Sequence, residues 1–195
     1  MNNKYSTVKP IRNSSLPQVF IETYGCQMNV NDSEVVLSVL QKAGYALCES
    51  LAEANVILVN TCSIRDNAEQ RIWGRLDVFL QEKKKRKNVV VGVLGCMAER
   101  LKEELLQHPA VDLVAGPDSY RNIANLLAAL DETGDKQINI KLLREETYAD
   151  ISPVRLDKNG VSAFISIMRG CNNVCSYCVV PYTRGAERSR DPYTI

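Results

Sequence analysis

The chain has 195 residues, of which 45% are hydrophobic and 24% charged, with a formal net charge of +1. This length suits one or two domains, and the near-neutral charge excludes a surface that is basic throughout, so contact with nucleic acid would need local basic patches. The longest apolar runs are far too short to span a membrane. Residues 1–17 are polar and lack the apolar core of an export signal, so we expect a flexible leader.

The hydrophobic pattern predicts an α/β fold. One alternating run and three short continuous apolar runs are typical of strands, and each is followed by a helical pattern. The strands are predicted at 18–24, 54–62, 88–96 and 111–117, and the helices at 30–45, 65–87, 98–107 and 119–133. Asp32 or Ser33 is expected to cap the first helix. Four such units with short connections predict a doubly wound parallel sheet.

The same pattern suggests two domains. Residues 18–130 are expected to form the first, and 131–160, which are polar and weakly patterned, a linker. Residues 161–195 begin with a predicted strand at 161–171 and are expected to start a second domain. The chain ends soon after a cysteine cluster, so we expect it to be the front part of a longer protein.

Three cysteines follow the first three predicted strands. They are Cys26, Cys62 and Cys96, and the gaps of 36 and 34 residues equal about one βαβ repeat. Parallel strands end at one edge of a sheet, where open α/β sheets bind ligands. The three thiols are therefore expected to converge there, each near a helix N-terminus that favours a thiolate. Cys48 falls at no such edge and is expected to be an ordinary thiol.

A second set of three cysteines lies in "RGCNNVCSYCVVPY". Cys171, Cys175 and Cys178 are spaced C-x3-C-x2-C, with no histidine after them. A reducing cytoplasm, expected in the absence of an export signal, favours metal or redox chemistry for such cysteines. Three thiolates suit an iron–sulfur cluster with one open iron, and zinc with three cysteines and water stays open as an alternative.

The C-x3-C-x2-C motif, with Tyr177 before its last cysteine, resembles the radical S-adenosylmethionine superfamily. Together with "TYGCQMNVNDSE", "NTCSIRDNAEQR" and "GCMAER", it resembles the methylthiotransferases within that superfamily, over about residues 18–195. The first of these motifs looks like the tRNA enzymes that act on isopentenylated adenosine. Sister groups, which act on threonylcarbamoyladenosine in tRNA or on a ribosomal protein, tend to differ there.

The resemblance implies two [4Fe–4S] clusters. Cys171, Cys175 and Cys178 would hold the one that binds S-adenosylmethionine, with Tyr177 beside it, and Cys26, Cys62 and Cys96 would hold an auxiliary cluster. Two molecules of S-adenosylmethionine would then place a methylthio group on C2 of N6-isopentenyladenosine next to the tRNA anticodon (A37). An aromatic C–H resists acid–base chemistry, which is why a radical cofactor is needed. The base must also be splayed out to enter.

The resemblance further implies that residues 161–195 start a partial (β/α) barrel. The implied partners are tRNA and an electron donor of flavodoxin or ferredoxin type, with no membrane partner and a monomeric state. A competing interpretation of another class is a non-catalytic iron–sulfur or zinc module, and whether this length of chain is active alone is open.

Several other residues have two interpretations each. The basic run at 82–88 is either a solvated helix end or an RNA contact. The arginines after the second cysteine set pair with a carboxylate or with tRNA phosphate. Three asparagines near cluster cysteines cap helices or contact cluster sulfurs. The arginines are Arg184, Arg188 and Arg190, and the asparagines are Asn29, Asn60 and Asn67. His108 and Trp73 are expected to be structural.

Overall fold

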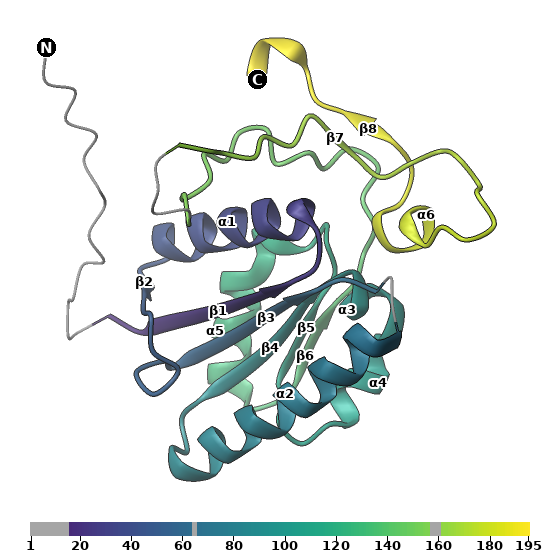
Figure 1. Cartoon of the computed structure of the whole chain (residues 1–195). Helices are drawn as coiled ribbons and strands as arrows, with labels where there is room; N and C mark the ends of the chain where they lie inside the picture. The colour runs from purple at the N-terminus through teal and green to yellow at the C-terminus, as the bar shows by residue number, and fades with distance from the viewer. Residues whose placement is uncertain (1–15, 64–65, 157–160) are drawn as a thin grey trace, which may run out of the picture.

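The structure, a computed structural model, describes residues 16–63, 66–156 and 161–195, without the side chains of residues 66–68. Its centre is a parallel six-stranded sheet in the order β2-β1-β3-β4-β5-β6 (Figure 1). The strands are β1 (Gln18–Tyr24), β2 (Ala46–Leu47), β3 (Val56–Thr61), β4 (Val90–Gly95), β5 (Leu113–Ala115) and β6 (Gln137–Asn139). The predicted α/β class with a parallel sheet is confirmed.

Helices cover both faces of the sheet. They are α1 (Gln27–Lys42), α2 (Asp66–Lys85), α3 (Cys96–Leu101), α4 (Glu103–Gln107) and α5 (Ile123–Thr133), with a 3-10 turn η1 (Tyr120–Asn122) before α5. Helices α1 and α5 pack on one face, and α2, α3 and α4 on the other. The sheet is therefore doubly wound, as predicted.

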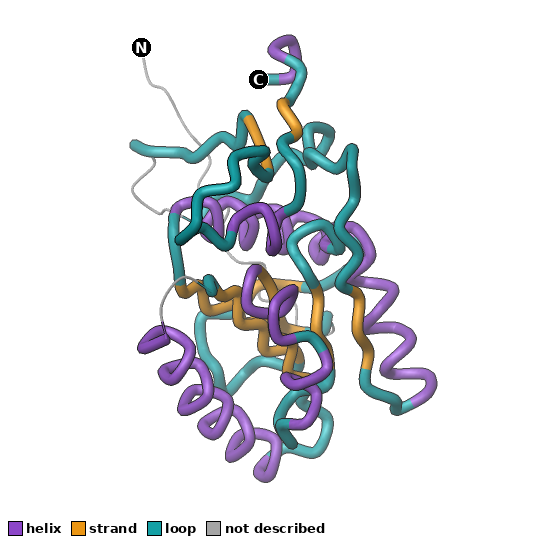
Figure 2. Tube along the Cα trace, turned by 90° about the vertical axis from the view of Figure 1, so that its right-hand side faces the viewer, coloured by secondary structure: helices purple, strands orange, loops and turns teal. Residues whose placement is uncertain are grey.

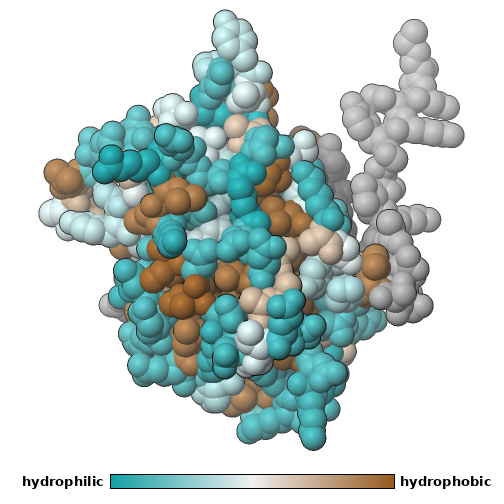
Figure 3. All heavy atoms as spheres, turned by 180° about the vertical axis from the view of Figure 1, so that it is seen from behind, coloured by the Kyte–Doolittle hydropathy of each residue, from teal (hydrophilic) through white to brown (hydrophobic). Residues whose placement is uncertain are grey.

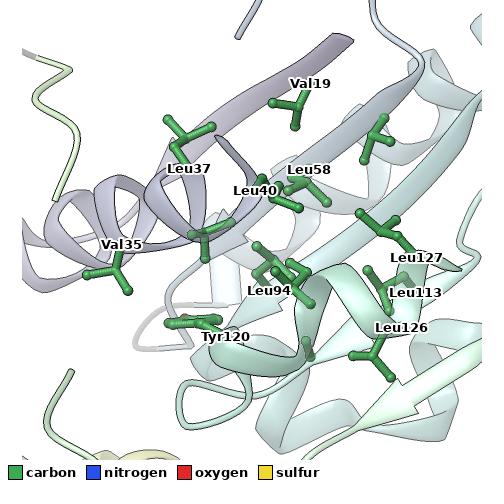
Figure 4. Packing of buried hydrophobic residues seen from close by; sticks show 14 of the residues in the cluster. Val19, Val35, Leu37, Leu40, Leu58, Leu94, Leu113, Tyr120, Leu126 and Leu127 are labelled. Atoms are coloured by element: carbon green, nitrogen blue, oxygen red, sulfur yellow. The ribbon is translucent and has the colours of Figure 1, made fainter. Parts of the chain in front are cut away.

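The core follows from the apolar runs. All six residues of β3 are buried, because a central parallel strand is covered on both faces. On the α1 side, Leu40 of α1, Leu58 of β3, Leu94 of β4 and Leu127 of α5 belong to one cluster (Figure 4). On the other side, Ile72, Leu76 and Phe79 present the predicted apolar face of α2 to the sheet.

Two helix boundaries differ from the prediction. Helix α1 begins at Gln27, with Cys26 as its N-cap, so Asp32 lies inside the helix and is buried instead of capping it. The predicted helix at 98–107 is two helices, because Lys102 has a φ of +50°, a left-handed conformation that breaks the α-helical ladder.

In the stretch 131–160, expected to be a linker, the described residues 131–156 contribute to the first unit. Strand β6 lies at 137–139 and pairs with β5, and Tyr148 and Ile151 are buried in the cluster with α1 and α5. The strand has only three residues, all half-buried, as befits a sheet edge, and its apolar signal is correspondingly weak.

Residues 161–195 contain two short paired strands and a helix. Strand β7 (Met168–Arg169) pairs antiparallel with β8 (Arg188–Ser189), α6 (Val180–Arg184) lies between them, and η2 (Pro192–Thr194) follows. The strand expected at 161–171 is thus only two residues long. Figures 1 and 2 show this segment on the α1 side of the sheet. The barrel that the resemblance implies stays a prediction.

Hydrophobic residues reach the surface in places. Figure 3, seen from behind, shows them in patches among hydrophilic residues. Several large exposed apolar side chains belong to the stretch before the second cysteine set, among them Val161, Ile165 and Ile167. Within the described residues, no helix is long and apolar enough to cross a membrane.

Candidate metal centre

The first cysteine set lies at the carboxyl edge of the sheet. In the strand register, Tyr24 of β1 pairs with Thr61 of β3, and Thr61 pairs with Gly95 of β4. Cys62 and Cys96 follow directly after these positions, and Cys26 follows Tyr24 by two residues. The three cysteines therefore leave neighbouring strands at nearly the same level, as the βαβ spacing predicted.

The turns before two of these cysteines require glycine. Gly95 has a φ of +91°, and a Cβ there would collide with the Asn60 side chain and the backbone of Thr61. Gly25 has a φ of +153°, and its Cβ would lie 2.8 Å from the Cβ of Cys62. Close packing at the edge thus brings the turn that carries Cys26 directly against Cys62.

A buried amide network ties this edge together. Asn29 donates from Nδ2 to Asn60 Oδ1 at 3.1 Å and to the Thr61 carbonyl at 3.2 Å. Asn60 donates in return to the Asn29 carbonyl and to Ser33 Oγ, both at 3.0 Å. Asn29 Oδ1 accepts from the Cys26 backbone N–H at 3.3 Å, which is a capping contact, and from the Cys26 thiol at 3.4 Å, so Asn29 caps the helix and also contacts this cysteine; a contact with cluster sulfur stays a prediction. The side chain of Asn67 lies outside the described part.

The second cysteine set lies in the exposed loop between β7 and α6. Cys175 is exposed, and Cys171 and Cys178 are half-buried. The Cys171 backbone N–H donates to the Gly185 carbonyl at 3.1 Å, and that of Cys178 to the Cys175 carbonyl at 3.0 Å. The Asn173 backbone N–H points at Cys171 Sγ, 3.4 Å away. Tyr177 is 91% exposed. These turns leave the loop open to solvent on one side.

Both sets have the donor chemistry that an iron–sulfur cluster needs, namely three thiols in a short loop or along one sheet edge. Among the described residues, however, no three Cys, His, Asp or Glu side chains are already gathered closely enough to hold a metal ion. The sets are thus brought to shared places in the fold, and their role as cluster ligands stays a prediction. Cys48 is buried in the α2-side core, as expected of an ordinary thiol.

Buried ion pairs fasten the second cysteine loop to the first unit. Asp32 of α1 accepts from Arg169 Nη1 at 2.6 Å and from Arg184 Nη2 at 2.8 Å. Asp118, just after β5, accepts from Arg188 Nη1 at 2.5 Å. All five side chains are at least 95% buried. Because Arg169 and Arg184 bracket the loop, its two ends are held against the carboxyl edge.

The electrostatics of Asp32 follow from this arrangement. Burial by itself would raise the pKa of the Asp32 carboxyl, but the charges and hydrogen bonds of Arg169 and Arg184 outweigh burial and lower this pKa. Asp32 is therefore charged at neutral pH, as a buried carboxylate between two guanidinium groups must be if the pairs are to form.

Sequence reasoning found part of this network. A carboxylate partner is one of the two alternatives predicted for Arg184 and Arg188. The structure confirms it, since Arg184 pairs with Asp32 and Arg188 with Asp118. Arg190 instead donates to the Ala149 carbonyl at 3.1 Å. The capping role predicted for Asp32 is wrong, because Cys26 is the N-cap, and the sequence pattern predicts no role for Asp118. Their partners lie 70 or more positions away in sequence, so no local pattern marks them.

The remaining candidates have structural roles. Trp73 packs against the α2-side core and lies 5.9 Å, ring centroid to centroid, from His108. In the basic run, Lys83 binds Asp112, and Arg86 donates to the Ala54 carbonyl at 2.7 Å. These contacts favour the helix-end interpretation of that run.

Comparison with known proteins gives the family. Residues 18–116, about half of the chain, match the model of "Uncharacterized protein family UPF0004". The chain belongs to this family. The matched region runs from β1 to the residue after β5 and so contains the strand ends that carry Cys26, Cys62 and Cys96.

Curated relatives of this UPF0004 chain are much longer than it. It is 58% identical to the tRNA-2-methylthio-N(6)-dimethylallyladenosine synthase of Bacteroides fragilis over 91% of the chain and 39% of the relative. It is 61% identical to the protein of that name from Amoebophilus asiaticus, over 91% of the chain and 36% of the relative. It is 55% identical to the protein of that name from Porphyromonas gingivalis, over 96% of the chain and 41% of the relative. The chain thus spans about two fifths of these relatives.

Proposed function

We propose that this chain is the N-terminal part of a radical S-adenosylmethionine tRNA methylthiotransferase that converts N6-isopentenyladenosine at A37 into its 2-methylthio derivative. The observation that carries the proposal is the placement of two cysteine sets at one edge of the sheet, the second fastened there by buried ion pairs. The printed names of the relatives, at 53–61% identity, support the same activity.

Each set would hold one [4Fe–4S] cluster. Cys26, Cys62 and Cys96 would hold the auxiliary cluster, and Cys171, Cys175 and Cys178 the one that binds S-adenosylmethionine. When bound, the clusters and S-adenosylmethionine supply the one-electron chemistry and the methylthio group that no side chain provides. With three protein thiolates at each set, a fourth iron position is left open to an outside ligand.

The chain's own residues position these groups. The Asn29–Asn60 network fixes the strand ends that carry the first set, and the Asp32 and Asp118 pairs hold the second set beside them. Tyr177, almost fully exposed next to Cys178, presents its ring to the solvent side of the loop and is proposed to contact S-adenosylmethionine.

The proposed partners follow from the reaction. The substrate is the anticodon stem-loop of tRNA bearing isopentenyladenosine, whose base is splayed out toward the two clusters. One-electron reduction needs a donor, proposed to be of flavodoxin or ferredoxin type. A tRNA-modifying enzyme acts where tRNA is used, so the proposed location is the cytoplasm, and the proposed state is a monomer.

Anaerobic reconstitution tests the cofactor assignment. Iron and sulfide are measured, with Mössbauer and EPR spectra, for the parent, for a variant with Cys171, Cys175 and Cys178 changed to Ala, and for one with Cys26, Cys62 and Cys96 changed to Ala. Two [4Fe–4S] clusters give about eight irons in the parent and about four in each variant. About four in the parent and none in the first variant would refute the auxiliary cluster. Zinc in place of iron would favour a non-catalytic module.

The substrate assignment needs the whole protein. Full-length protein, reduced and supplied with S-adenosylmethionine, is incubated with tRNA that carries isopentenyladenosine or threonylcarbamoyladenosine, and nucleosides are identified by mass spectrometry. The proposal predicts the methylthio product only from the isopentenyl substrate. Product from the threonylcarbamoyl substrate alone would assign the protein to a sister group.

A further inference from the structure

Arg184 has an unused donor in a buried place. Its guanidinium is 2% exposed and binds Asp32 through Nη2 at 2.8 Å. Its other terminal nitrogen, Nη1, is buried and has no hydrogen-bond partner among the described residues. A buried charged donor without an acceptor is unfavourable, so such a group calls for an explanation.

Two neighbouring arginines also have an unpaired nitrogen, but their surroundings differ. Arg169 Nε lies 3.8 Å from Asp118 Oδ1, itself an unpaired atom, so a small side-chain movement pairs the two. Arg188 Nε is unpaired as well, yet that guanidinium already donates to Asp118 and to the carbonyl of Arg184. Arg184 Nη1 has no comparable acceptor in the described network.

Cys96 is a sulfur acceptor on the helix that packs against the helix of Arg184. Helix α6, which ends with Arg184, packs against α3, which begins with Cys96, and the Cys96 side chain is buried. The Arg184 guanidinium interacts electrostatically with Cys96 as well as with Asp32 and Tyr120. A protonated thiol is a weak acceptor, whereas thiolate or cluster sulfur is a strong one.

We propose that Arg184 donates from Nη1 to sulfur at Cys96 when the auxiliary cluster is bound, so that the segment carrying the second cysteine set supplies a hydrogen bond to the first. This inference rests on the proposed function, because it needs a cluster at Cys26, Cys62 and Cys96. Asp32 holds the guanidinium in place, and Arg184 thereby couples the electronic properties of one set to the docking of the other. Hydrogen bonds to sulfur stabilise the reduced, more negative cluster.

The test uses the chain with Cys171, Cys175 and Cys178 changed to Ala, so that only the auxiliary cluster is loaded. Its midpoint potential and EPR spectrum are compared with those of Arg184→Lys and Arg188→Lys in the same background. Lys at position 184 keeps the positive charge but lacks the planar fork of donors with which Arg can bind Asp32 and Cys96 at the same time. The expected result is a more negative potential and an altered EPR spectrum for Arg184→Lys. Arg188→Lys, a matched change in the same buried network, should leave both unchanged.

Other outcomes separate the two ideas. Background protein that binds no iron overturns the auxiliary cluster and this inference with it. Background protein that binds iron, with equal potentials for all three chains or with equal shifts in both Lys variants, overturns only this inference, because Arg184 then acts at most by docking. If Arg184→Lys does not fold, Arg184→Gln is compared with Arg188→Gln, because both changes remove one charge and both leave Asp32 paired with Arg169. A more negative potential for Arg184→Gln than for Arg188→Gln is expected, and equal potentials overturn the inference.

Discussion

Removal of the Asp32 carboxylate tests whether the second cysteine loop is held by charge. Asp32→Ala leaves the guanidinium groups of Arg169 and Arg184 buried without their shared acceptor. Removal of one partner from a buried ion pair typically costs about 3–5 kcal/mol, because the remaining charge stays desolvated. The free energy of unfolding is therefore expected to fall by about that amount, a large part of the 5–15 kcal/mol that is usual for a domain.

The matched control is Asp150→Ala. Asp150 also pairs with an arginine, Arg121, but its side chain is 69% exposed. Hydrogen bonding from Arg121 lowers the pKa of Asp150 to about 2, yet solvent screens such pairs, so removal should cost only about 0–1 kcal/mol. Urea denaturation at pH 7, followed by circular dichroism, gives both values.

Hydrogen exchange shows where the loss occurs. In Asp32→Ala, amides of β7, α6 and β8 should exchange faster, while those of β3 and β4 in the sheet core keep their protection. A loss as small as that of Asp150→Ala, or unchanged exchange in β7 and α6, would refute the view that Asp32 anchors the loop.

The pH dependence gives a second check on Asp32. Its pKa is lowered in the folded state, so the stabilisation is present above the pKa of the unfolded chain and is lost as pH falls through the folded pKa. The difference in stability between parent and Asp32→Ala should therefore shrink in acid. A difference that is constant from pH 7 down to the acid transition would show that the effect comes from packing alone.

Three more predictions concern the carboxyl edge and its neighbours. Gly95→Ala should lower the free energy of unfolding, measured by urea denaturation, by about 3 kcal/mol, because a Cβ there meets backbone. Gly134→Ala, also at positive φ but in open space, should lower it by only about 1 kcal/mol. Equal losses in the two variants would contradict this reasoning. Burial raises the pKa of Glu99 to about 7, so the stability of the parent should fall as pH rises from about 4.5 to about 7. Glu99→Gln should therefore be about 2 kcal/mol more stable than the parent at pH 8 but not near pH 4.5. A difference between the two that does not change with pH would count against this prediction. In reconstituted chain, Cys62→Ala should lose the auxiliary iron, about four per chain, whereas Cys48→Ala should keep it.

The sheet could be read from the sequence because its strands are local signals. Residues 56–61 form an unbroken buried run, and the repeat distance of the cysteines gave the common edge. Strand β6 was missed because three half-buried residues carry little pattern. The break at Lys102 was missed because the helical periodicity continues across it and only the backbone conformation changes.

The attachment of the second cysteine loop to the first unit could not be predicted in this way, because the type of a polar residue does not tell whether its side chain is solvated or buried. Asp32 in "VNDSE" has the local signature of an N-cap. What makes it an anchor is a pair of arginines 137 and 152 positions later. A sequence shows that such arginines exist but not which carboxylate the fold places against them.

The start of α1 joins these observations. Its polar residues from Asn29 to Glu34 look like a solvated helix end, yet each is buried and has a partner outside the helix. Asn31 donates to the Phe164 carbonyl at 3.1 Å, and Glu34 accepts from Arg155 at 2.9 Å and from the Leu156 backbone N–H at 3.0 Å. Asp32 binds the arginines on either side of the second cysteine loop. The helix whose N-cap is Cys26 is thus also the surface that binds Arg155, Leu156 and Phe164 and, through Asp32, the two arginines beside the second cysteine loop.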